Sequence, residues 1–274
     1  MHACRSERAG SRQPRLLSAL PALLVLLSLL PHPARAEGWL AYEARYAVYR
    51  NGKLAGKAEF TVEPTGEAGE WTIRSEASGT HGMARLLRAR DVEHTIGRIR
   101  DGRFWPEQFT HHTTIAGIDD RWTADFDWQS GRVFIAEGKE RRELDLGEHP
   151  LDGLSLKLEL QQRLRNGTGS GFNENLVFRL VDDDEIKEQT YRMRERERLE
   201  TSLGCLDTIP VERVRTGSKR YTRAWHAPNL EYVTVRMEHG KTGGNHMEMR
   251  ITELVLDGEP VAPQAGCTAY QGAP

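Results

Sequence analysis

The sequence lacks the short motifs that mark the common catalytic and metal sites. It contains no H-E-x-x-H zinc motif, no G-x-S-x-G nucleophile elbow and no C-x-x-C pair. An EF-hand loop counted from Asp125 fails, because Ser130 stands where the loop needs Gly and Ala136 where it needs Glu. We therefore predict no catalytic residues, no metal and no cofactor. We interpret the acidic run at residues 182–185 as a solvated loop.

Weaker candidates for chemistry do not assemble a site in the sequence. His111 and His112 are adjacent, and neighbours on a strand point to opposite faces, so they are a poor pair for one metal. Cys205 is a candidate nucleophile with His226 as a distant base, provided that Cys205 is not disulfide-bonded. These observations favour a protein that is not an enzyme.

Long apolar runs are also missing, except near the start of the chain. Four arginines before residue 16 are followed by an apolar stretch over residues 16–30 and then by Ala34-Arg35-Ala36. A basic region, a short apolar region and an A-x-A site are the three parts of a secretory signal peptide. A membrane span needs about 20 apolar residues, and no Cys stands at the cleavage site. We predict cleavage after Ala36 and delivery to the periplasm of a Gram-negative cell envelope, with no integral membrane segment left.

Positive charge is scarce once the signal peptide is removed. Cleavage takes away five of the 38 basic and one of the 40 acidic residues, which leaves 33 and 39 and a formal net charge of −6. Nucleic-acid binding wants a basic patch or stripe, so we predict no nucleic-acid partner. The same balance argues against general attraction to anionic membrane surfaces.

Cysteine is rare, and removal of the signal peptide changes the number of cysteines. The precursor has three cysteines, and the mature chain keeps two, Cys205 and Cys267. An even pair in an oxidising compartment readily forms a disulfide, so we predict a Cys205 to Cys267 bond. It would tie the C-terminal tail to the chain near residue 205.

What the mature chain has in abundance is alternation of apolar and polar residues with period two, which is typical of strands. Residues 121–128 show it most clearly, with Trp122, Ala124, Phe126 and Trp128 on one face. Asn51-Gly52, Asp101-Gly102 and Asp257-Gly258 mark turns. Many short strands at this spacing predict an all-β fold, a single antiparallel barrel or half-barrel.

One helix interrupts the strands. Asp152 is a plausible N-cap, leucines recur at helical spacing after it, and Asn166-Gly167 supplies a stop. We expect this helix to plug or cover one end of the sheet. The predicted organisation is a signal peptide at 1–36, one β-barrel-like domain at 37–259 and a poorly ordered tail at 260–274.

Several segments together resemble a known family. They are 102–107, 126–128, 151–155, 199–208 and the stretch Trp225-His226-Ala227-Pro228-Asn229-Leu230 with the Arg-rich strand before it. In order and spacing they resemble the exported bacterial proteins of domain of unknown function 3108 (DUF3108), over roughly residues 42–256. Val233-Thr234-Val235 departs from the Pro and Val that this family has after the equivalent of Tyr232. The resemblance implies an envelope location and a barrel-like fold, and no activity.

Two groups of side chains are candidates for ligand binding. Aromatic residues on strand faces could line an apolar cavity of a barrel. A row of arginines on residues 190–199 could bind phosphate or carboxylate, although interleaved glutamates make a cross-strand ladder of ion pairs the favoured interpretation. The candidate residues are Trp105, Trp122, Phe126, Trp128, Trp225, Arg192, Arg194 and Arg196.

Three functional hypotheses follow. The first is a periplasmic binding or envelope-maintenance protein that holds an apolar or amphipathic, lipid-like ligand in a barrel cavity. The second is an envelope scaffold that contacts a protein partner through an edge strand or the Arg-rich strand. The third is an enzyme acting on envelope polysaccharide or lipid with a pair such as Asp125 and Asp127, which alternation already explains as the solvated face of a strand.

Overall fold

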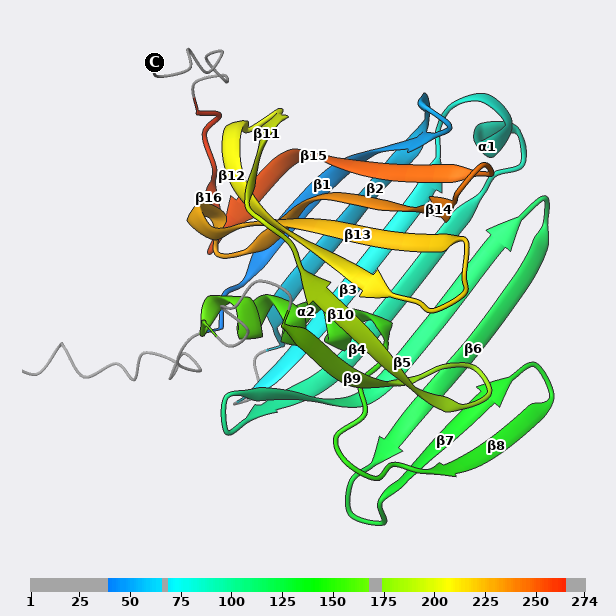
Figure 1. The fold of residues 1–274 in the computed structure, drawn as a ribbon. Coiled ribbons are helices and arrows are strands. Elements are labelled where there is room, and N and C mark those ends of the chain that lie inside the picture. The colour runs from blue at the N-terminus through cyan, green and yellow to red at the C-terminus, as the bar shows by residue number, and fades with distance from the viewer. Residues whose placement is uncertain (1–38, 66–68, 168–173, 265–274) are drawn as a thin grey trace, which may run out of the picture. The chain divides into compact units, whose positions relative to one another are not determined.

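A computed structural model describes residues 39–65, 69–167 and 174–264. One continuous antiparallel sheet of sixteen strands curls around a single long helix, α2 (Gly153–Arg165), and does not close (Figure 1). The all-β, half-barrel prediction is confirmed. The predicted signal peptide and Cys267 lie outside the described residues.

The strands follow the sheet in an order that departs from the order of the chain at two places, between β1 and β15 and between β12 and β10, because β11 pairs only with β12. The path is β8-β7-β6-β5-β4-β3-β2-β1-β15-β14-β13-β12-β10-β9, so β15 pairs with β1 and joins the two ends of the chain. The bounds are β1 (Tyr42–Arg50), β2 (Lys53–Pro64), β3 (Glu70–Gly79), β4 (Arg90–Arg100), β5 (Arg103–Ile115), β6 (Ile118–Asp127), β7 (Arg132–Glu137), β8 (Glu140–Asp145), β9 (Asn175–Val181), β10 (Ile186–Met193), β11 (Glu197–Thr201), β12 (Gly204–Val214), β13 (Arg220–Ala227), β14 (Val233–Lys241), β15 (His246–Leu256) and β16 (Glu259–Pro260).

Helix α2 begins where the sequence predicts. The buried Asp152 carboxylate accepts hydrogen bonds from the backbone N–H groups of Leu154 and Ser155, at 2.8 and 3.0 Å, which completes a capping box. The same carboxylate oxygen accepts a bond from Thr95 Oγ1 of β4 at 2.8 Å. The cap therefore fixes the helix to the sheet. Asn166 ends the helix, as expected.

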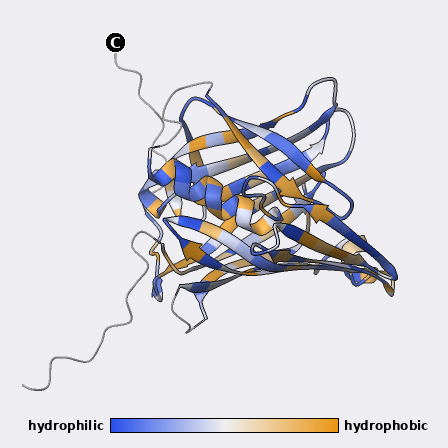
Figure 2. Ribbon diagram, turned by 90° about the horizontal axis from the view of Figure 1, so that it is seen from below, coloured by the Kyte–Doolittle hydropathy of each residue, from blue (hydrophilic) through white to orange (hydrophobic). Residues whose placement is uncertain are grey.

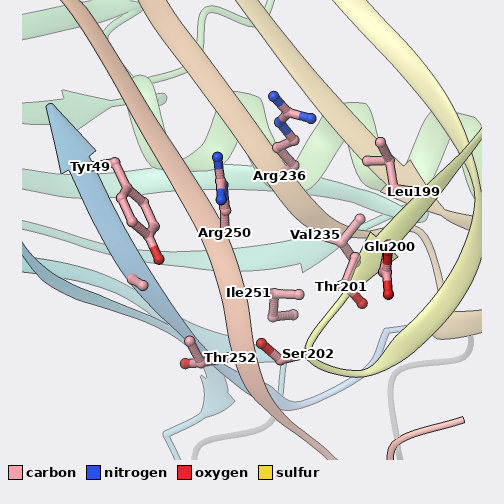
Figure 3. Close-up of a pocket in the computed structure, with 11 residues that line it drawn as sticks. Tyr49, Leu199, Glu200, Thr201, Ser202, Val235, Arg236, Arg250, Ile251 and Thr252 are labelled. Atoms are coloured by element: carbon pink, nitrogen blue, oxygen red, sulfur yellow. The ribbon is translucent and has the colours of Figure 1, made fainter. Parts of the chain in front are cut away.

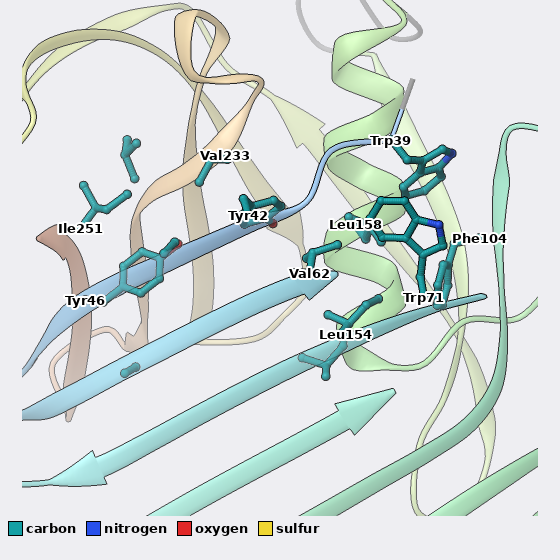
Figure 4. Packing of buried hydrophobic residues seen from close by; sticks show 14 of the residues in the cluster. Trp39, Tyr42, Tyr46, Val62, Trp71, Phe104, Leu154, Leu158, Val233 and Ile251 are labelled. Carbon is teal, nitrogen blue, oxygen red and sulfur yellow. The ribbon is translucent and has the colours of Figure 1, made fainter. Parts of the chain in front are cut away.

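Helix α2 is buried on two sides because it lies between two walls of the curled sheet (Figure 4). Leu154 and Leu158 pack into the core made largely by β1 to β7, while Leu156, Leu160 and Leu164 pack against residues of β9, β10 and β12. Figure 2 shows apolar and polar residues alternating along the strands and around the helix. We call the sheet face that contacts α2 the inner face, and the opposite one the outer face.

Polar bonds also attach the helix to the sheet. Tyr42 of β1 donates its hydroxyl to Gln161 Oε1 at 2.9 Å, and Gln161 Nε2 donates to the carbonyl of Glu231 at 2.8 Å. Burial raises the pKa of Tyr42 well above its usual range, so this hydroxyl stays protonated. The helix end of the inner face is therefore closed by both apolar packing and satisfied hydrogen bonds.

The remaining elements are short. Helix α1 (Gly82–Leu86) is a single turn between β3 and β4 that the sequence does not predict, and η1 (Pro228–Leu230) is a 3₁₀ turn. The predicted turn at Asn51-Gly52 has φ of 50° and 75°, the left-handed conformation that this pair favours. No helix in the described part of the chain is long and apolar enough to cross a membrane.

The predicted disulfide stays a prediction, because Cys267 lies outside the described residues. The last described residues do lie beside the chain near residue 204. Gln264 donates its backbone N–H to the carbonyl of Leu203 at 2.8 Å, and Gly204 lies against Gln264. Cys267 lies three positions after Gln264 in the sequence, and Cys205 directly follows Gly204.

Candidate functional site

The structure distributes the eight predicted ligand residues over both faces of the sheet. Trp122, Ala124 and Phe126 lie on the inner face, as alternation predicts, and Phe126 stacks on Trp128 with ring centroids 5.9 Å apart. Trp105 and Trp128 pack together around His149, with ring centroids 4.7 Å apart. Trp225 lies on the outer face, where it is covered by Glu197 of β11 and by the guanidinium of Arg236. The eight do not form one site.

The Arg-rich segment is divided by the structure. Residues 194–196 join β10 to β11, so residues 190–199 do not form one strand. Arg192 donates to Asn175 Oδ1, Arg194 pairs with Glu212, and Arg196 is exposed between the strands. Arg223 of β13 shares Glu212 at 3.1 Å. This part of the outer face is the ladder of cross-strand ion pairs that the interleaved charges favour.

The burial of the inner-face side chains decreases along several strands with distance from α2. Next to α2 its side chains are fully buried, but on β3, β5, β6 and β15 the side chains two residues further along are only half-buried. The buried members are Ile73, Phe109, Ala124 and Ile251, and the half-buried ones are Ser75, His111, Trp122 and Met249. We call these two parts the covered half and the open half. The open half lies on the concave side of the curled sheet, beyond the strand ends that pack against α2 (Figure 1).

Much of the open half is apolar. Met237 and Met249 are direct partners across β14 and β15, and Ala224 lies beside Met237 on β13. On the other wall, Trp122 packs against Phe109 with ring centroids 4.8 Å apart. Methionine and tryptophan offer adaptable apolar contacts. Half-exposed apolar side chains on a concave face are typical of a ligand surface.

One wall of the open half carries an acidic network on β4 and β5. Asp91 Oδ1 lies 2.7 Å from His111 Nε2 and accepts a bond from Thr113 Oγ1 at 2.6 Å. Burial raises the pKa of Asp91, but these two bonds outweigh burial and leave its pKa below the usual range. Glu93, on the same face, pairs with Lys157 of α2 at 3.3 Å.

The hydrogen bonds determine which nitrogen of His111 carries the proton. Trp122 Nε1 lies 3.0 Å from His111 Nδ1, and an indole N–H can only donate. Nδ1 therefore holds the lone pair, and Nε2–H donates to Asp91. The bond with Asp91 raises the pKa of His111, yet protonation would cost the Trp122 bond, because an imidazolium has no lone pair to accept it.

This geometry does not fit a nucleophile relay. In such a relay the carboxylate and the nucleophile bind opposite nitrogens of the imidazole ring. Here Thr113 Oγ1, at 3.2 Å, and Asp91 both contact Nε2, and Trp122 occupies Nδ1. Among the residues that the structure describes, no group of three or more His, Cys, Asp or Glu side chains is placed to hold a metal ion. The network fits a binding surface.

The adjacent histidine turns away, as alternation predicts. His112 Nε2 contacts Asp119 at 3.2 Å on the outer face, while His111 faces the concave side. The two rings therefore do not converge on one point.

The opposite wall of the open half is basic. Arg213 pairs across the sheet with Tyr191, and Arg215 follows two residues later on the same face of the chain. Arg215 Nη2 donates to Thr222 Oγ1 at 3.2 Å, but its Nη1 is buried and has no hydrogen-bond partner in the described chain. Burial and the charges of Arg213 and Arg220 lower the pKa of Arg215.

These arginines differ from those of the outer face. No carboxylate among the described residues lies within ion-pair distance of Arg213, Arg215 or Arg220. Burial and the same three arginines lower the pKa of the nearby His239, so repulsion is not relieved locally. Guanidinium groups present donors in a fork that matches the geometry of carboxylate and phosphate groups. Sequence reasoning missed this group, because only strand register brings β10, β12, β13 and β14 together.

A second concavity lies on the outer face, beneath β11 (Figure 3). Its volume is about 420 Å³. Arg236 and Arg250 reach into it, but both lie 2.8 Å from Glu248, which is 4% exposed, so their charges are compensated. The crevice is therefore less suited to an anion than the wall with Arg213 and Arg215. Its lining residues are Ala47, Tyr49, Leu199, Glu200, Thr201, Ser202, Val235, Arg236, Arg250, Ile251 and Thr252.

Solved structures with a similar fold include proteins of uncharacterised families. A β-barrel-like protein of domain of unknown function DUF1849 from Brucella abortus has a TM-score of 0.50 and 13% identity, covering 79% of this chain and 98% of that one. At this identity the likeness shows the fold alone.

Two more distant likenesses carry no argument. A protein from Bacteroides fragilis, described as exported and YmcC-like in fold, has a TM-score of 0.31, 10% identity and coverage of 78% and 95%. A protein from Parabacteroides distasonis, described as a lipoprotein, has a TM-score of 0.34, 12% identity and coverage of 78% and 95%.

The family is shown by the sequence itself. A search of curated proteins gives no match. The model of one family matches residues 42–250, which include β1 to β14, α2 and most of the inner face. This chain therefore belongs to the family described as protein of unknown function DUF3108.

Proposed function

We propose that the protein binds an amphipathic anion on the open half of the inner face. The observation that carries the proposal is the coincidence, on one concave face of the sheet, of half-buried apolar side chains and arginines that have no acidic partner among the described residues. The apolar part of the ligand lies against Met237, Met249 and Trp122. Its anionic group binds Arg213 and Arg215.

The apolar part and the anionic part of the proposed ligand would each relieve a free-energy cost that the ligand-free protein has. Half-exposed methionines on a concave face keep apolar surface in water, at about 25 cal/mol for each Å². The buried Nη1 of Arg215 gives up hydration without a partner, and its neighbours repel it. A ligand with an apolar chain and an anionic head relieves both costs at once, which a neutral or a purely ionic ligand does not.

The ligand surface is tested by placing a charge on its apolar floor. Met237→Glu should weaken binding of 11-(dansylamino)undecanoic acid, a fluorescent amphipathic anion, by about tenfold or more. Val177→Glu is the matched control, because Val177 is 49% exposed on the outer face of β9. Equal affinities for the two variants, or no binding by the wild type, would argue against the proposal.

We further propose that the protein works in the periplasm. The basic, apolar and A-x-A segments of residues 1–36 support export with cleavage after Ala36. The intact mass of the protein recovered from the periplasm tests this directly. A chain beginning at residue 37, two hydrogens lighter than its reduced form, is expected from cleavage and a Cys205 to Cys267 bond.

A scaffold role through an edge strand is less well supported. The free edge of the sheet at β8 is charged at every residue except Leu144, a pattern that discourages strand addition. The edge at β9 is partly occupied, because Leu151 makes a parallel bridge to Leu180 and exchanges hydrogen bonds with the backbone on either side of it. Neither edge offers a long, apolar row of unpaired backbone groups.

A further inference from the structure

The exposed apolar side chains are concentrated at one end of the sheet. Eight large hydrophobic residues are exposed in the described chain, and six of them lie in or beside four connections at the end of the sheet opposite α2 (Figure 1). Met83 and Leu86 of α1 are 63% and 72% exposed, and Ile118 is 69% exposed. We call this set the apolar rim, and its members are Leu54, Met83, Leu86, Ile115, Ile118 and Met247.

Hydrogen bonds join the four connections into one continuous edge. Ala116, in the β5–β6 turn, donates to the carbonyl of Leu87 just after α1 at 2.7 Å. His81, just before α1, donates to the carbonyl of Ala55 on β2 at 3.0 Å. Asn51, in the β1–β2 turn, donates to the carbonyl of His246 at 2.8 Å. The apolar rim is therefore one continuous edge, at the strand ends toward which the open half lies.

The rim is basic, although the mature chain as a whole is acidic. Residues 50–54, 80–89, 114–121 and 241–247 hold six Lys or Arg and two Asp, a difference of +4. None of the six basic side chains forms an ion pair with another residue that the structure describes. Exposed apolar residues interleaved with unpaired basic ones are typical of surfaces that sit in a lipid headgroup region.

We propose that the apolar rim docks on the surface of an anionic phospholipid bilayer. Met83, Leu86 and Ile118 enter the headgroup region, and Lys53, Arg85 and Arg88 contact lipid phosphates. Docking in this orientation points the mouth of the open half at the membrane. The inference goes beyond the proposed ligand, because the rim and the inner-face arginines are different residues that can be tested separately.

Vesicle co-sedimentation of the mature chain, residues 37–274, tests the proposal. The wild type should sediment with vesicles of phosphatidylglycerol and phosphatidylcholine at 1:1, and more weakly with phosphatidylcholine alone. Met83→Ser, Leu86→Ser and Ile118→Ser combined should reduce the partition coefficient by about tenfold or more. Each substitution removes an apolar side chain that the wild type buries in the headgroup region on docking. The control, Phe134→Ser with Val177→Ser, removes the two exposed apolar residues outside the rim and should have no effect.

The charge contribution has its own variant. Arg85→Glu with Arg88→Glu should abolish the preference for phosphatidylglycerol. All of these side chains are exposed, so circular dichroism should show folded proteins. The proposal is overturned if the wild type does not bind the mixed vesicles, or if the rim and control variants bind equally. Each rim variant should still bind the soluble dansyl probe like the wild type, which separates a failure of docking from a failure of the ligand site.

Discussion

The covered and open halves of the inner face belong to the same strands, but they differ in packing and in how fully their polar groups are hydrogen-bonded. In the covered half, leucines from both sides of α2 fill the space, and Asp152, Thr95, Tyr42 and Gln161 satisfy one another. In the open half, apolar side chains are only half-buried, and one buried nitrogen of Arg215 has no hydrogen-bond partner among the residues that the structure describes. A strand can thus serve stability at one end and binding at the other.

The comparison teaches where to expect a loss of stability and where a loss of function. Substitutions in the covered half remove packing or break satisfied bonds, so they should lower the free energy of unfolding. Substitutions in the open half remove groups that the free protein does not need. They should leave folding intact or improve it, which is the usual relation between stability and a binding site.

The largest effect should come from the helix that fills the covered half. Leu154→Ala opens a cavity at a fully buried position and should lower the free energy of unfolding by about 3 kcal/mol. Met237→Ala, in the open half, should cost about 1 kcal/mol or less, because Met237 is only half-buried. Urea denaturation measures both, and similar losses in the two variants would erase the distinction between the halves.

The next effect is a pH dependence that arises from His226. This residue is 2% exposed on the inner face, its Nδ1 bonds the carbonyl of Tyr232, and burial lowers its pKa from 6.5 to about 4. A depressed pKa means that the unfolded chain binds the proton first. The free energy of unfolding should therefore hold above pH 6.5 and fall by about 3 kcal/mol as the pH drops to about 4.

The contribution of His226 can be isolated by substitution. His226→Asn keeps a side-chain donor for the carbonyl of Tyr232 and removes the titration. Its unfolding free energy should vary less between pH 7 and pH 4 than that of the wild type, and the slope that remains reports other groups such as His149, whose pKa burial also lowers to about 4. An unchanged slope would show that His226 does not titrate as its burial implies.

A smaller effect concerns the acidic wall of the open half. Trp122→Phe keeps the ring but removes the N–H that bonds His111 Nδ1. The lone pair becomes free to take a proton, so the pKa of His111 should rise, by about one unit. Histidine NMR signals followed over pH measure the shift, and a pKa that stays the same would mean that Trp122 does not set the tautomer.

The smallest effect has an unusual sign. Arg213→Gln relieves the repulsion of Arg215 and His239, so the ligand-free protein should be more stable by about 0.5 kcal/mol. Arg198→Gln, which removes an exposed pair with Asp207 on β12, should cost about 0.5 kcal/mol or less. Thermal unfolding of the two variants compares them. A loss of stability at Arg213 would mean that it has a partner in the free protein.

Local signals were sufficient for most of the fold. The alternation around Trp122, the turn at Asn51-Gly52 and the cap at Asp152 each depend on a few adjacent residues, and the structure has all three. Helix α1 was missed because it is five residues long, has no side-chain cap and buries none of its residues. A continuous strand over residues 190–199 was predicted from alternation alone, which continues across the link between β10 and β11.

The open half could not be predicted, because it depends on register between distant strands. His111 was noticed as half of an adjacent pair, but its partners Asp91 and Trp122 come from β4 and β6. Arg213 and Arg215 have no special spacing in the sequence. They stand out because none of the described acidic residues pairs with them on the inner face, whereas Arg194, equally basic, pairs with Glu212 on the outer face.

The most direct test of the central claim compares one ligand chain with two head groups. The dansylated undecanoic acid and its methyl ester should be titrated against the wild type and against Arg213→Gln with Arg215→Gln. We predict that the wild type prefers the acid by about tenfold or more, and that the variant binds both with the affinity that the wild type has for the ester. An undiminished preference for the acid in the variant would contradict the account.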